Sequence, residues 1–482
     1  MIASPDADVV SSDLPPSSGG ALSLALVVLV ISFLALAILS PLFAYEKESS
    51  PVLAIVVLLV TAGVAYLVVV RDILTRTLTT RHAKVIILTG LCMRALMLPS
   101  VPMQEDDYYR YLWDGAMVAH GWNPYQFVPQ QIVEGETAIP ETVRELANQS
   151  RPVIERINHP WLRTIYPPTA QAPFALAHAI SPWSLVALRV IWLGLEAICI
   201  LLIISLLGQL KLPVSRAAIW WLNPILVKEI YNSGHMELTV VVFVLLALWL
   251  MAKARPVLAG GALGLAAAAK IWPVLLLPLL LRAMPTHRTR LCSAALFLFI
   301  VIVSAVPILV AGLDSDSGFT AYAQRWEMND LAYMAFNELG QFVAGPQSKL
   351  GRILVMVTIA SGVVWLIRKP IAQDGDLVRR CLLIAAMTFL LSPTQMPWYY
   401  LWLLPLLPFW PLRGLLLLSA MLPLYYLRFA LASVDMTHWF DHGIIWLEHL
   451  PVWIILVVDA IKSRRAARES AKAPATATQV TI

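Results

Sequence analysis

The stretch that decides the fold is ALSLALVVLVISFLALAILSPLF, residues 21–43, an apolar run without a single charged residue. About 20 apolar residues in a helix are enough to cross the hydrocarbon core of a bilayer. The rest of the chain has the same character: 59% of its 482 residues are hydrophobic and 13% are charged. Soluble domains contain about 25% charged residues. The sequence therefore predicts an all-α, polytopic helical bundle in a membrane.

The apolar runs predict about 12–13 spans together with half-helices. The run 256–281 is expected to form two half-helices, because Pro273 in the sequence KIWP interrupts the hydrogen-bond ladder of a helix. The run 169–180 is too short to span and is interpreted as re-entrant or interfacial. The expected spans are 21–43, 51–70, 84–99, 183–208, 217–231, 237–252, 291–313, 352–367, 378–392, 398–412, 414–432 and 443–461.

The ends of the chain differ from this bundle. Residues 1–20 are rich in Ser, Pro and Asp and contain no Lys or Arg, so a disordered cytoplasmic tail is expected there and not a signal peptide. Residues 462–482 are expected to form a basic cytoplasmic tail, which leaves the bundle itself at 21–461. The four cysteines are scattered and form no CxxC pair, so buried thiols are expected.

The distribution of basic residues predicts the orientation. With the N-terminus in the cytoplasm, more than half of the 35 Lys and Arg residues fall in cytoplasmic segments, as the positive-inside rule requires. Segments 100–170 and 314–350 then face outward. Segment 100–170 is the only long polar stretch and holds nine acidic residues and five arginines. We therefore expect a multi-pass protein of the inner or plasma membrane, with its active site on the extracytoplasmic side.

The sequence VPMQEDDYYRYLWDG, residues 101–115, begins this outer segment. It is expected to form a helix from Gln104, with acids in the first turn where the helix dipole favours them. The spacing of Asp107, Arg110 and Asp114 places them on one face, so that Arg110 can pair with either carboxylate while Asp106 points away. The alternative is an interfacial helix whose charges are simply solvated.

Ionisable residues also occur inside or beside the spans, where charge is costly. The sequence NPILVKEIYNSGHMELT, residues 223–239, carries Lys228 and Glu229, which either neutralise each other or face a cavity. The glycine before His235 allows close backbone approach, which favours a site there. Lys270 ends the small-residue run AGGALGLAAAAK and either presents a cation at the outer interface or extends to the headgroups.

The segment INHPWLRTIYPPTAQAPF (157–174) offers flat aromatic surfaces to sugar rings or to lipid, and SPTQMPWYYLW (392–402) adds further aromatics. The segment GWNPYQFVP (121–129) is expected to end the helix before it, because Asn-Pro and Pro129 disfavour helical continuation. No segment has the spacing of a metal site, and none of the common nucleotide-binding or hydrolase motifs is present. No metal and no cofactor are therefore expected. The net charge of +5 follows membrane topology, and no nucleic-acid partner is expected.

The order of DYYRYLWDG, NPY, YPP and GHME along the chain resembles the GT-C glycosyltransferases. In particular it resembles glycosyltransferase family 87 and related polyprenyl-phosphate-mannose-dependent mannosyltransferases, from about residue 84 to 410. The resemblance implies a GT-C-like helical bundle whose catalytic acids lie in the first large extracytoplasmic loop, where this chain has Asp106 and Asp107. Relatives often read G-H-x-Asp where this chain has His235-Met236-Glu237.

The resemblance implies transfer of a hexose, with mannose the expected sugar, from a polyprenyl-phosphate donor to a glycan, glycolipid or lipid acceptor. A carboxylate takes the proton of the acceptor hydroxyl in a single displacement with inversion, with Asp107 the expected base and Asp106 the alternate. Candidates for the donor phosphate are His235, Lys270 and Arg110. The residues expected to contact sugar or acceptor are Asp114, Trp122, Tyr125, His159, Tyr166, Glu237, Arg325, Trp326, Trp398 and Tyr399.

Two other functions fit the composition. A transporter or flippase of lipid-linked sugars would use broken helices, but transporters often show paired repeats and only one broken pair is present here. A non-catalytic membrane protein of envelope assembly would carry the same acids as a solvated helix face.

Overall fold

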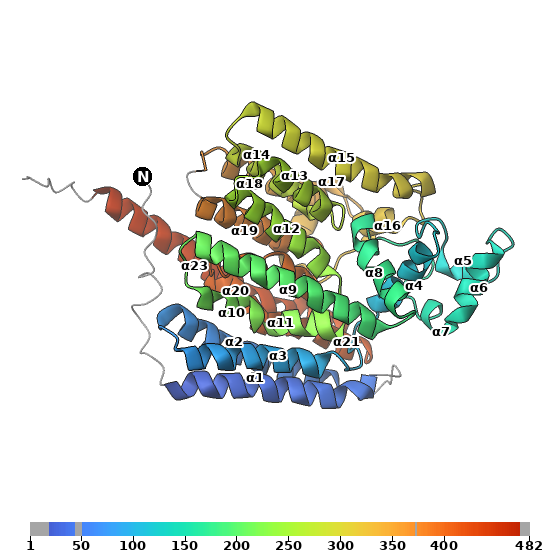
Figure 1. The fold of residues 1–482 in the computed structure, drawn as a ribbon, viewed down its shortest axis with the longest axis horizontal. Coiled ribbons are helices and arrows are strands. Elements are labelled where there is room, and N and C mark those ends of the chain that lie inside the picture. Colours follow the sequence, from blue (N-terminus) through green and yellow to red (C-terminus); the bar gives the residue numbers. More distant parts are fainter. Residues whose placement is uncertain (1–18, 44–50, 372–373, 473–482) are drawn as a thin grey trace, which may run out of the picture.

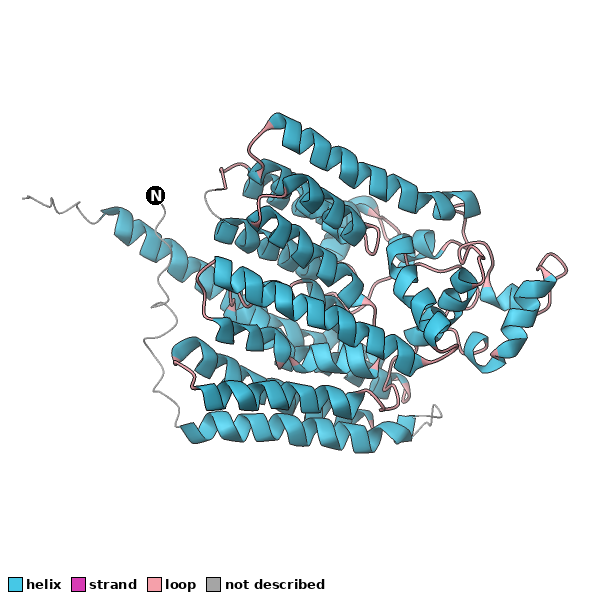
Figure 2. Ribbon diagram, in the orientation of Figure 1, coloured by secondary structure: helices cyan, strands magenta, loops and turns pink. Residues whose placement is uncertain are grey.

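The computed structural model describes residues 19–43, 51–371 and 374–472 of the chain. Over these residues the protein is helical and contains no strand, which confirms the all-α prediction (Figure 2). The predicted disordered tail lies outside the described residues, except that residues 19 and 20 begin the first helix. Of the predicted basic tail, residues 462–472 continue the last helix, and 473–482 lie outside the described part.

Seven helices in the described ranges are long and apolar enough to cross a membrane, which confirms a polytopic membrane protein (Figure 1). Three of these spans consist of consecutive helical segments, because prolines or a wider π-helical turn change the helix geometry within them. The seven are α1 (Gly19–Leu39) with η2 (Ser40–Phe43), α2 (Val52–Thr75), α9 (Leu185–Gln209), α15 (His287–Ala311), α18 (Leu350–Ile367), α20 (Arg413–Met421) with η8 (Leu422–Tyr426) and α21 (Leu427–Ala432), and α22 (Thr437–Trp439) with η9 (Phe440–Ile444) and α23 (Ile445–Lys472).

Other apolar runs form helices that are shorter or carry more charge. The described residues therefore contain seven helices that meet the length and hydropathy of a span, compared with the 12–13 spans expected. These are α3 (Thr80–Met97), α12 (Glu237–Ala252), α13 (Pro256–Ala267), η5 (Trp272–Leu276), α14 (Leu277–Ala283) and α19 (Asp374–Leu391). The break between α13 and η5 confirms the predicted pair of half-helices at 256–281.

Two of the expected spans are not continuous helices, and the prediction is wrong there. Residues 217–231 form η3 (Val214–Ala217), α10 (Ala218–Trp221), α11 (Pro224–Val227) and η4 (Lys228–Asn232). Residues 398–412 form η6 (Pro397–Trp402) and η7 (Leu404–Leu406). Prolines at 224, 397, 405, 408 and 411 lack the backbone N–H that a continuous helix needs. Most of both segments is buried, so neighbouring helices and not lipid surround them.

A separate group of short helices lies at one end of the bundle, on the right in Figure 1. It consists of α4 (Asp107–Ala119), α5 (Pro129–Val133), α6 (Glu141–Gln149), α7 (Arg151–Ile154), α8 (Pro168–Ile180) and α16 (Gly318–Arg325), whereas α17 (Leu331–Ala344) packs against α18 of the bundle. The small core of this group contains Trp113, Val143 and Ile154. Arg163 ties it to the end of α15 by donating to the Ala311 carbonyl at 2.6 Å, and the backbone N–H of Arg163 donates to Asp316 O at 2.9 Å. The expected outward segments 100–170 and 314–350 therefore meet at the same end.

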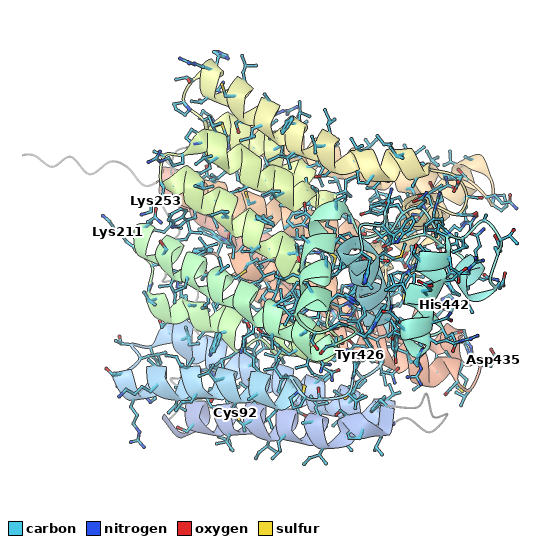
Figure 3. The ribbon with its side chains drawn as sticks, turned by 45° about the vertical axis from the view of Figure 1, so that its right-hand side comes forward. Cys92, Lys211, Lys253, Tyr426, Asp435 and His442 are labelled. Carbon is cyan, nitrogen blue, oxygen red and sulfur yellow. The ribbon has the colours of Figure 1, made fainter. Side chains whose placement is uncertain are left out.

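Labelled charges mark the two ends of the molecule (Figure 3). Lys211 and Lys253 lie at the end far from the short helices, whereas Asp435 and His442 lie at the end where the short helices gather.

Close packing of small residues places the two helices that frame the site. A Cβ atom on Gly260 of α13 would lie 2.1 Å from Ser293 Oγ of α15, so only glycine permits this approach. Among the short helices, a Cβ atom on Gly115 of α4 would lie 2.4 Å from Phe174 O of α8. Both contacts bring backbones together as small residues do in membrane bundles.

Candidate active site

A cavity of about 1440 Å³ lies where α4 and the start of α8 meet the broken helices of the bundle. Its polar wall contains both acids expected to be catalytic. Ten of the fifteen residues selected from the sequence line it: Asp106, Asp107, Arg110, His159, Tyr166, Glu237, Lys270, Trp326, Trp398 and Tyr399. The other five lie outside its lining: Asp114, Trp122, Tyr125, His235 and Arg325. The fold thus brings together residues that are far apart in the sequence.

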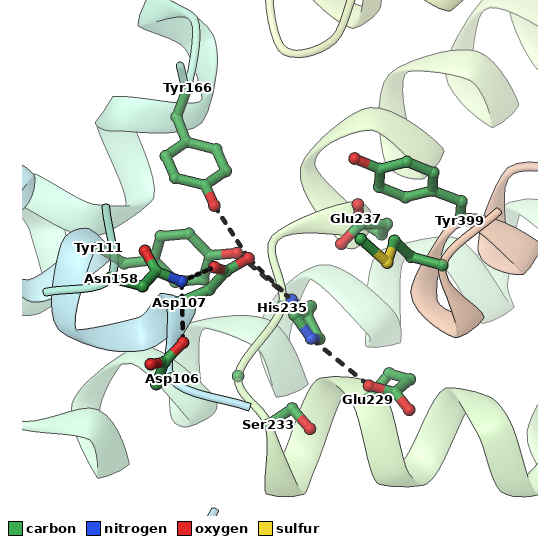
Figure 4. A network of polar contacts seen from close by, with 12 residues as sticks. Asp106, Asp107, Tyr111, Asn158, Tyr166, Glu229, Ser233, His235, Glu237 and Tyr399 are labelled. Atoms are coloured by element: carbon green, nitrogen blue, oxygen red, sulfur yellow. Dashed lines mark hydrogen bonds and ion pairs between the residues drawn. The ribbon is translucent and has the colours of Figure 1, made fainter. Parts of the chain in front are cut away.

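Asp107 is held by two neutral hydrogen-bond donors (Figure 4). Asn158 Nδ2 donates to Asp107 Oδ1 at 2.8 Å, and the Tyr166 hydroxyl donates to Oδ2 at 3.0 Å. The Asp107 side chain keeps 21% of its surface exposed. The Asp107 carboxylate is therefore oriented and partly exposed at the cavity wall.

Asp106 shares the same amide, contrary to the expectation that it points away. Asn158 Nδ2 also donates to Asp106 Oδ1 at 2.8 Å. The helix begins at Asp107 and not at Gln104, because Gln104 has a φ of +66° and Asp106 is the N-cap residue. Helical spacing does not apply to a residue at the N-cap, so the two carboxylates converge on one donor.

Arg110 forms no ion pair with a carboxylate among the residues that the structure describes. Its Nη2 donates to the carbonyl oxygens of Asn158 at 3.2 Å and His159 at 3.1 Å. Arg110 is buried, and burial lowers its pKa while Asp114 opposes that shift. The guanidinium therefore fixes the loop that supplies Asn158.

His235 lies behind Asp107 and is fully buried. Its ring stacks on Trp398 with 3.9 Å between ring centroids. Nδ1 lies 3.8 Å from Asp107 Oδ2, and Nε2 lies 3.5 Å from Glu229 Oε2 (Figure 4). Gly234 has a φ of +82°, the left-handed conformation that glycine adopts without strain, and so lets the chain turn into this position. The imidazole thus stands between two carboxylates and not on the cavity wall.

Lys228 and Glu229 are an internal ion pair, which confirms that they neutralise each other. Lys228 Nζ lies 3.3 Å from Glu229 Oε1, and both side chains are fully buried. Ser233 accepts from Lys228 at 3.0 Å, and the Tyr426 hydroxyl donates to Glu229. The charges of this pair are satisfied within the protein.

Of the three residues expected to bind phosphate, Lys270 and Arg110 line the cavity. Lys270 presents an ammonium group there. Its Nζ lies 2.7 Å from Glu237 Oε1 and 3.7 Å from the centre of the Tyr399 ring. Glu237 Oε2 is buried and has no hydrogen-bond partner within the described part of the chain. Lys270 thus neutralises one oxygen of Glu237 and leaves the other as an acceptor at the cavity.

Two expected sugar-binding residues hold Tyr166 from behind. The Tyr125 hydroxyl donates to Tyr166 O at 2.6 Å. Gln171 Nε2 donates to Tyr166 O at 3.0 Å and to Asp114 Oδ2 at 3.2 Å. Burial raises the pKa of Asp114 to about 6, against the opposing effect of Arg110. Tyr125 and Asp114 therefore support the hydrogen bond to Asp107 from outside the cavity.

Two further expected residues lie away from the acids. Trp122 packs in the small outer core against Phe127, with 6.1 Å between ring centroids. Arg325 is exposed at the end of α16. Its neighbour Trp326 does line the cavity and meets His159 edge-on at 4.7 Å. These residues are selected from the sequence only because they are aromatic or basic, and residue type does not predict where a side chain points.

Sequence reasoning missed Asn158 and Asn232. Asn232 accepts from the Met103 N–H at 3.0 Å and donates to Ser100 Oγ and Val101 O, both at 2.7 Å. It thereby anchors the segment that leads into the acids. Both asparagines lie in segments that the sequence analysis selects for their other residues, and that position is the only sequence feature that could have indicated them.

The cavity also has apolar walls. One comprises Ile271 and Val274 beyond the break after α13, together with Val301, Ala305 and Ile308 of α15. Ile271 is 79% exposed, so this wall continues onto the outer surface of the bundle. Among the residues that the structure describes, no group of three or more His, Cys, Asp or Glu side chains is arranged to hold a metal ion.

Comparison with known proteins agrees with the resemblance in the sequence. The model of glycosyltransferase family 87 matches residues 164–393. The matched segment contains Tyr166, His235, Glu237 and Lys270. No curated protein and no solved structure matches the chain. The family match confirms the resemblance over residues 164–393, and together with the apolar helices it supports a membrane glycosyltransferase.

Proposed function

We propose that the protein transfers a hexose, with mannose the expected sugar, from a polyprenyl-phosphate donor to a glycan, glycolipid or lipid acceptor. The reaction takes place on the extracytoplasmic face. The observation that carries the proposal is the carboxylate of Asp107, oriented by Asn158 and Tyr166 on the wall of a large cavity that also holds Lys270. An oriented base and a cation facing one space are what a single displacement at an anomeric carbon needs.

The reaction follows from these two groups. The acceptor hydroxyl oxygen forms a bond to the anomeric carbon as the bond from that carbon to the phosphate oxygen breaks. The bonding electron pair leaves with the polyprenyl phosphate, and Asp107 takes the hydroxyl proton. Attack opposite the leaving group inverts the anomeric centre. Asp106 shares Asn158 with Asp107 and is the alternate base.

Lys270 is the residue that we assign to the leaving phosphate. Its ammonium group lies on the cavity wall, and its position over the Tyr399 ring fixes its direction. Arg110 is occupied by two carbonyl groups and His235 stands outside the lining, so neither is assigned this role. Glu237 Oε2 has an open acceptor site that suits a sugar hydroxyl.

His235 is assigned to Asp107 instead. At 3.8 Å from Oδ2, the imidazole limits the positions that the carboxylate adopts, and the stack on Trp398 fixes the ring. We expect His235 to position the base without touching the substrate.

Access for a lipid follows from the apolar wall beside Lys270. Ile271 and Val274 lead from the cavity to the outer surface of the bundle, so an isoprenoid tail can remain in the bilayer while its phosphate reaches Lys270. Nucleotide sugars are made in the cytoplasm, so an outward-facing transferase needs a donor already carried across the membrane. A polyprenyl-phosphate sugar meets this need.

The test measures sugar transfer by purified protein in liposomes with a radiolabelled polyprenyl-phosphate hexose and a membrane glycolipid extract as acceptor. D107N is expected to lose about 100-fold or more of the rate. E141Q is the matched control, because Glu141 is 69% exposed in the same outer segment. Full transfer by both D107N and D106N would overturn the assignment of the base. Movement of unconsumed donor across the liposomes would indicate a transporter.

The orientation is tested with alkaline phosphatase fused after residue 135. The enzyme is active only outside the cytoplasm, so an active fusion is expected. An inactive fusion, with an active one after Lys253, would reverse the orientation.

A further inference from the structure

Glu105 is the third acid of the outer segment and has no part in the transfer step described above. It lines the same cavity as Asp106 and Asp107. Gln104, with its φ of +66°, turns the chain immediately before it. A non-glycine residue in this conformation costs energy and persists where the surrounding structure requires it. The turn therefore directs Glu105 to a defined place at the cavity.

The carboxyl group of Glu105 is not satisfied by the protein. Its Oε1 atom is buried and has no hydrogen-bond partner in the residues described. The charge of Lys228 acts on Glu105, but Glu229, Ser233 and Tyr426 already surround that ammonium group. A buried polar atom without a partner is costly, and in a cavity wall it is satisfied when a ligand binds.

Burial and the neighbouring carboxylates favour the neutral form of Glu105. Asp106 and Asp107 stand on the same segment, and Lys228 and Glu229 face it from η4. Tyr425 and Tyr426 of η8 interact with it electrostatically from the other side. Burial raises the pKa of Glu105 well above its usual range, and the three carboxylates add to the shift while Lys228 opposes it. A neutral carboxyl group both donates and accepts a hydrogen bond.

The position of Glu105 relative to the donor follows from the stereochemistry of the proposed reaction. In an inverting displacement the acceptor hydroxyl approaches from the side opposite the leaving phosphate. If Lys270 binds that phosphate, the acceptor occupies the part of the cavity away from α13. Glu105 is two residues before the base and interacts electrostatically with Tyr425, which lines the cavity together with Phe429 of the span 413–432.

We propose that Glu105 is an acceptor-binding residue whose carboxyl group hydrogen-bonds a hydroxyl of the acceptor sugar next to the one that attacks. This inference rests on the proposed function, because it takes Asp107 as the base and Lys270 as the phosphate ligand. It assigns the acceptor to the η8 and α21 side of the cavity. Discrimination between acceptors then depends on Glu105, whereas donor binding does not.

The test compares steady-state kinetics of E105A and E105Q with wild type at pH 7, with the acceptor and the donor varied in turn. E105A is expected to raise the acceptor KM by about tenfold, the effect of one lost hydrogen bond in a buried site, with the donor KM unchanged within twofold. E105Q keeps a donor and an acceptor and is expected to bring the acceptor KM back to within about threefold of wild type. E136A, an exposed acid in the same segment, is the control.

A pH series separates binding from a merely structural role. As pH rises through its raised pKa, Glu105 ionises, loses its donor hydrogen and repels Asp107. The acceptor KM of wild type is therefore expected to rise on the alkaline side, and that of E105Q to stay level. Equal changes of donor and acceptor KM in E105A, or the same alkaline rise in E105Q, would overturn the proposal. Loss of all transfer in D107N together with an unchanged acceptor KM in E105A would overturn the role of Glu105 alone.

Discussion

The hydroxyl of Tyr166 donates a 3.0 Å hydrogen bond to Oδ2 of Asp107, and this bond joins the segment before α8 to the first residue of α4. Pro167 and Pro168 follow Tyr166 directly and occupy the N-cap and first position of α8, so the backbone that carries the tyrosine has little freedom. Rigid support of this kind keeps a carboxylate in one orientation without neutralising its charge.

Replacing Tyr166 by Phe tests this support. Y166F is expected to lower kcat by about tenfold or more, because a hydrogen bond to a charged group is worth about 1.5–3 kcal/mol. The donor KM should change little, since the ring and its contacts remain. Y333F is a matched control: Tyr333 also donates to a carboxylate, Glu327 at 2.9 Å, but does not line the cavity. Equal rates for Y166F and Y333F would contradict a role for Tyr166 in orienting the base.

Asn158 provides a second test, because one amide donates to both Asp106 and Asp107. N158A removes the donor that stabilises two neighbouring negative charges. A fall of about tenfold in kcat at pH 7 is therefore expected, because the carboxylate loses a donor that orients it. An unchanged kcat in N158A would show that the bridge has no influence on the base.

Gly115 should be essential to the contact between α4 and α8. In G115A the new Cβ atom would lie 2.4 Å from the backbone oxygen of Phe174, so the helices have to separate. We expect a loss of about 1–3 kcal/mol in stability, seen as a lower melting temperature in detergent, together with reduced transfer. G194A is the control, since nothing lies within 4 Å of a Cβ atom there. A melting temperature of G115A equal to that of G194A would contradict the packing argument.

Asp114 predicts a pH dependence of stability. Its pKa is about 6 in the folded protein and 3.8 in a free chain, so the folded state holds the proton more tightly. The contribution of Asp114 is therefore most favourable below about pH 4, falls as pH rises to about 6, and is level above that. The full change is about 3 kcal/mol, because a difference of one in pKa between the folded and unfolded protein corresponds to about 1.4 kcal/mol.

The measurement compares melting temperatures of wild type and D114N between pH 4 and 8. Wild type is expected to lose stability relative to D114N up to about pH 6, because asparagine does not titrate. A difference that is the same at every pH would show that Asp114 keeps an ordinary pKa in the fold.

The sequence was informative where a local rule decides the structure. Apolar runs predicted the membrane bundle, and Pro273 predicted the break at Lys270, because both depend on residues close in the chain. The same rule applied to Pro405 and Pro408 would have predicted the interruption of 398–412, which hydropathy alone had suggested to be a span.

The site was predictable only in part, because its contacts are long-range. Asn158 meets Asp107 across 51 residues, and no spacing rule connects them. His235 lies in a segment of ionisable residues and is therefore predicted to bind phosphate. In the structure it stacks on Trp398 and lies behind Asp107. The packing of α16 decides where the side chains of Arg325 and Trp326 point. Both are predicted to contact sugar or acceptor, but only Trp326 lines the cavity, whereas Arg325 is exposed.

Lys270 gives the sharpest test of the proposed donor site. K270M removes the cation while keeping the apolar stem, and is expected to lower kcat/KM for the donor by about 100-fold, since the leaving phosphate loses its counter-charge. The variant also leaves Glu237 buried without its partner 2.7 Å away, which endangers folding.

The double variant K270M/E237Q removes both charges and so tests the cation in a neutral, folded site. K253M, at the opposite end of the bundle, is the control for loss of a lysine. The double variant should remain as slow as K270M with the donor while its melting temperature approaches that of wild type. Recovery of donor kinetics along with stability would show that Lys270 serves only to neutralise Glu237.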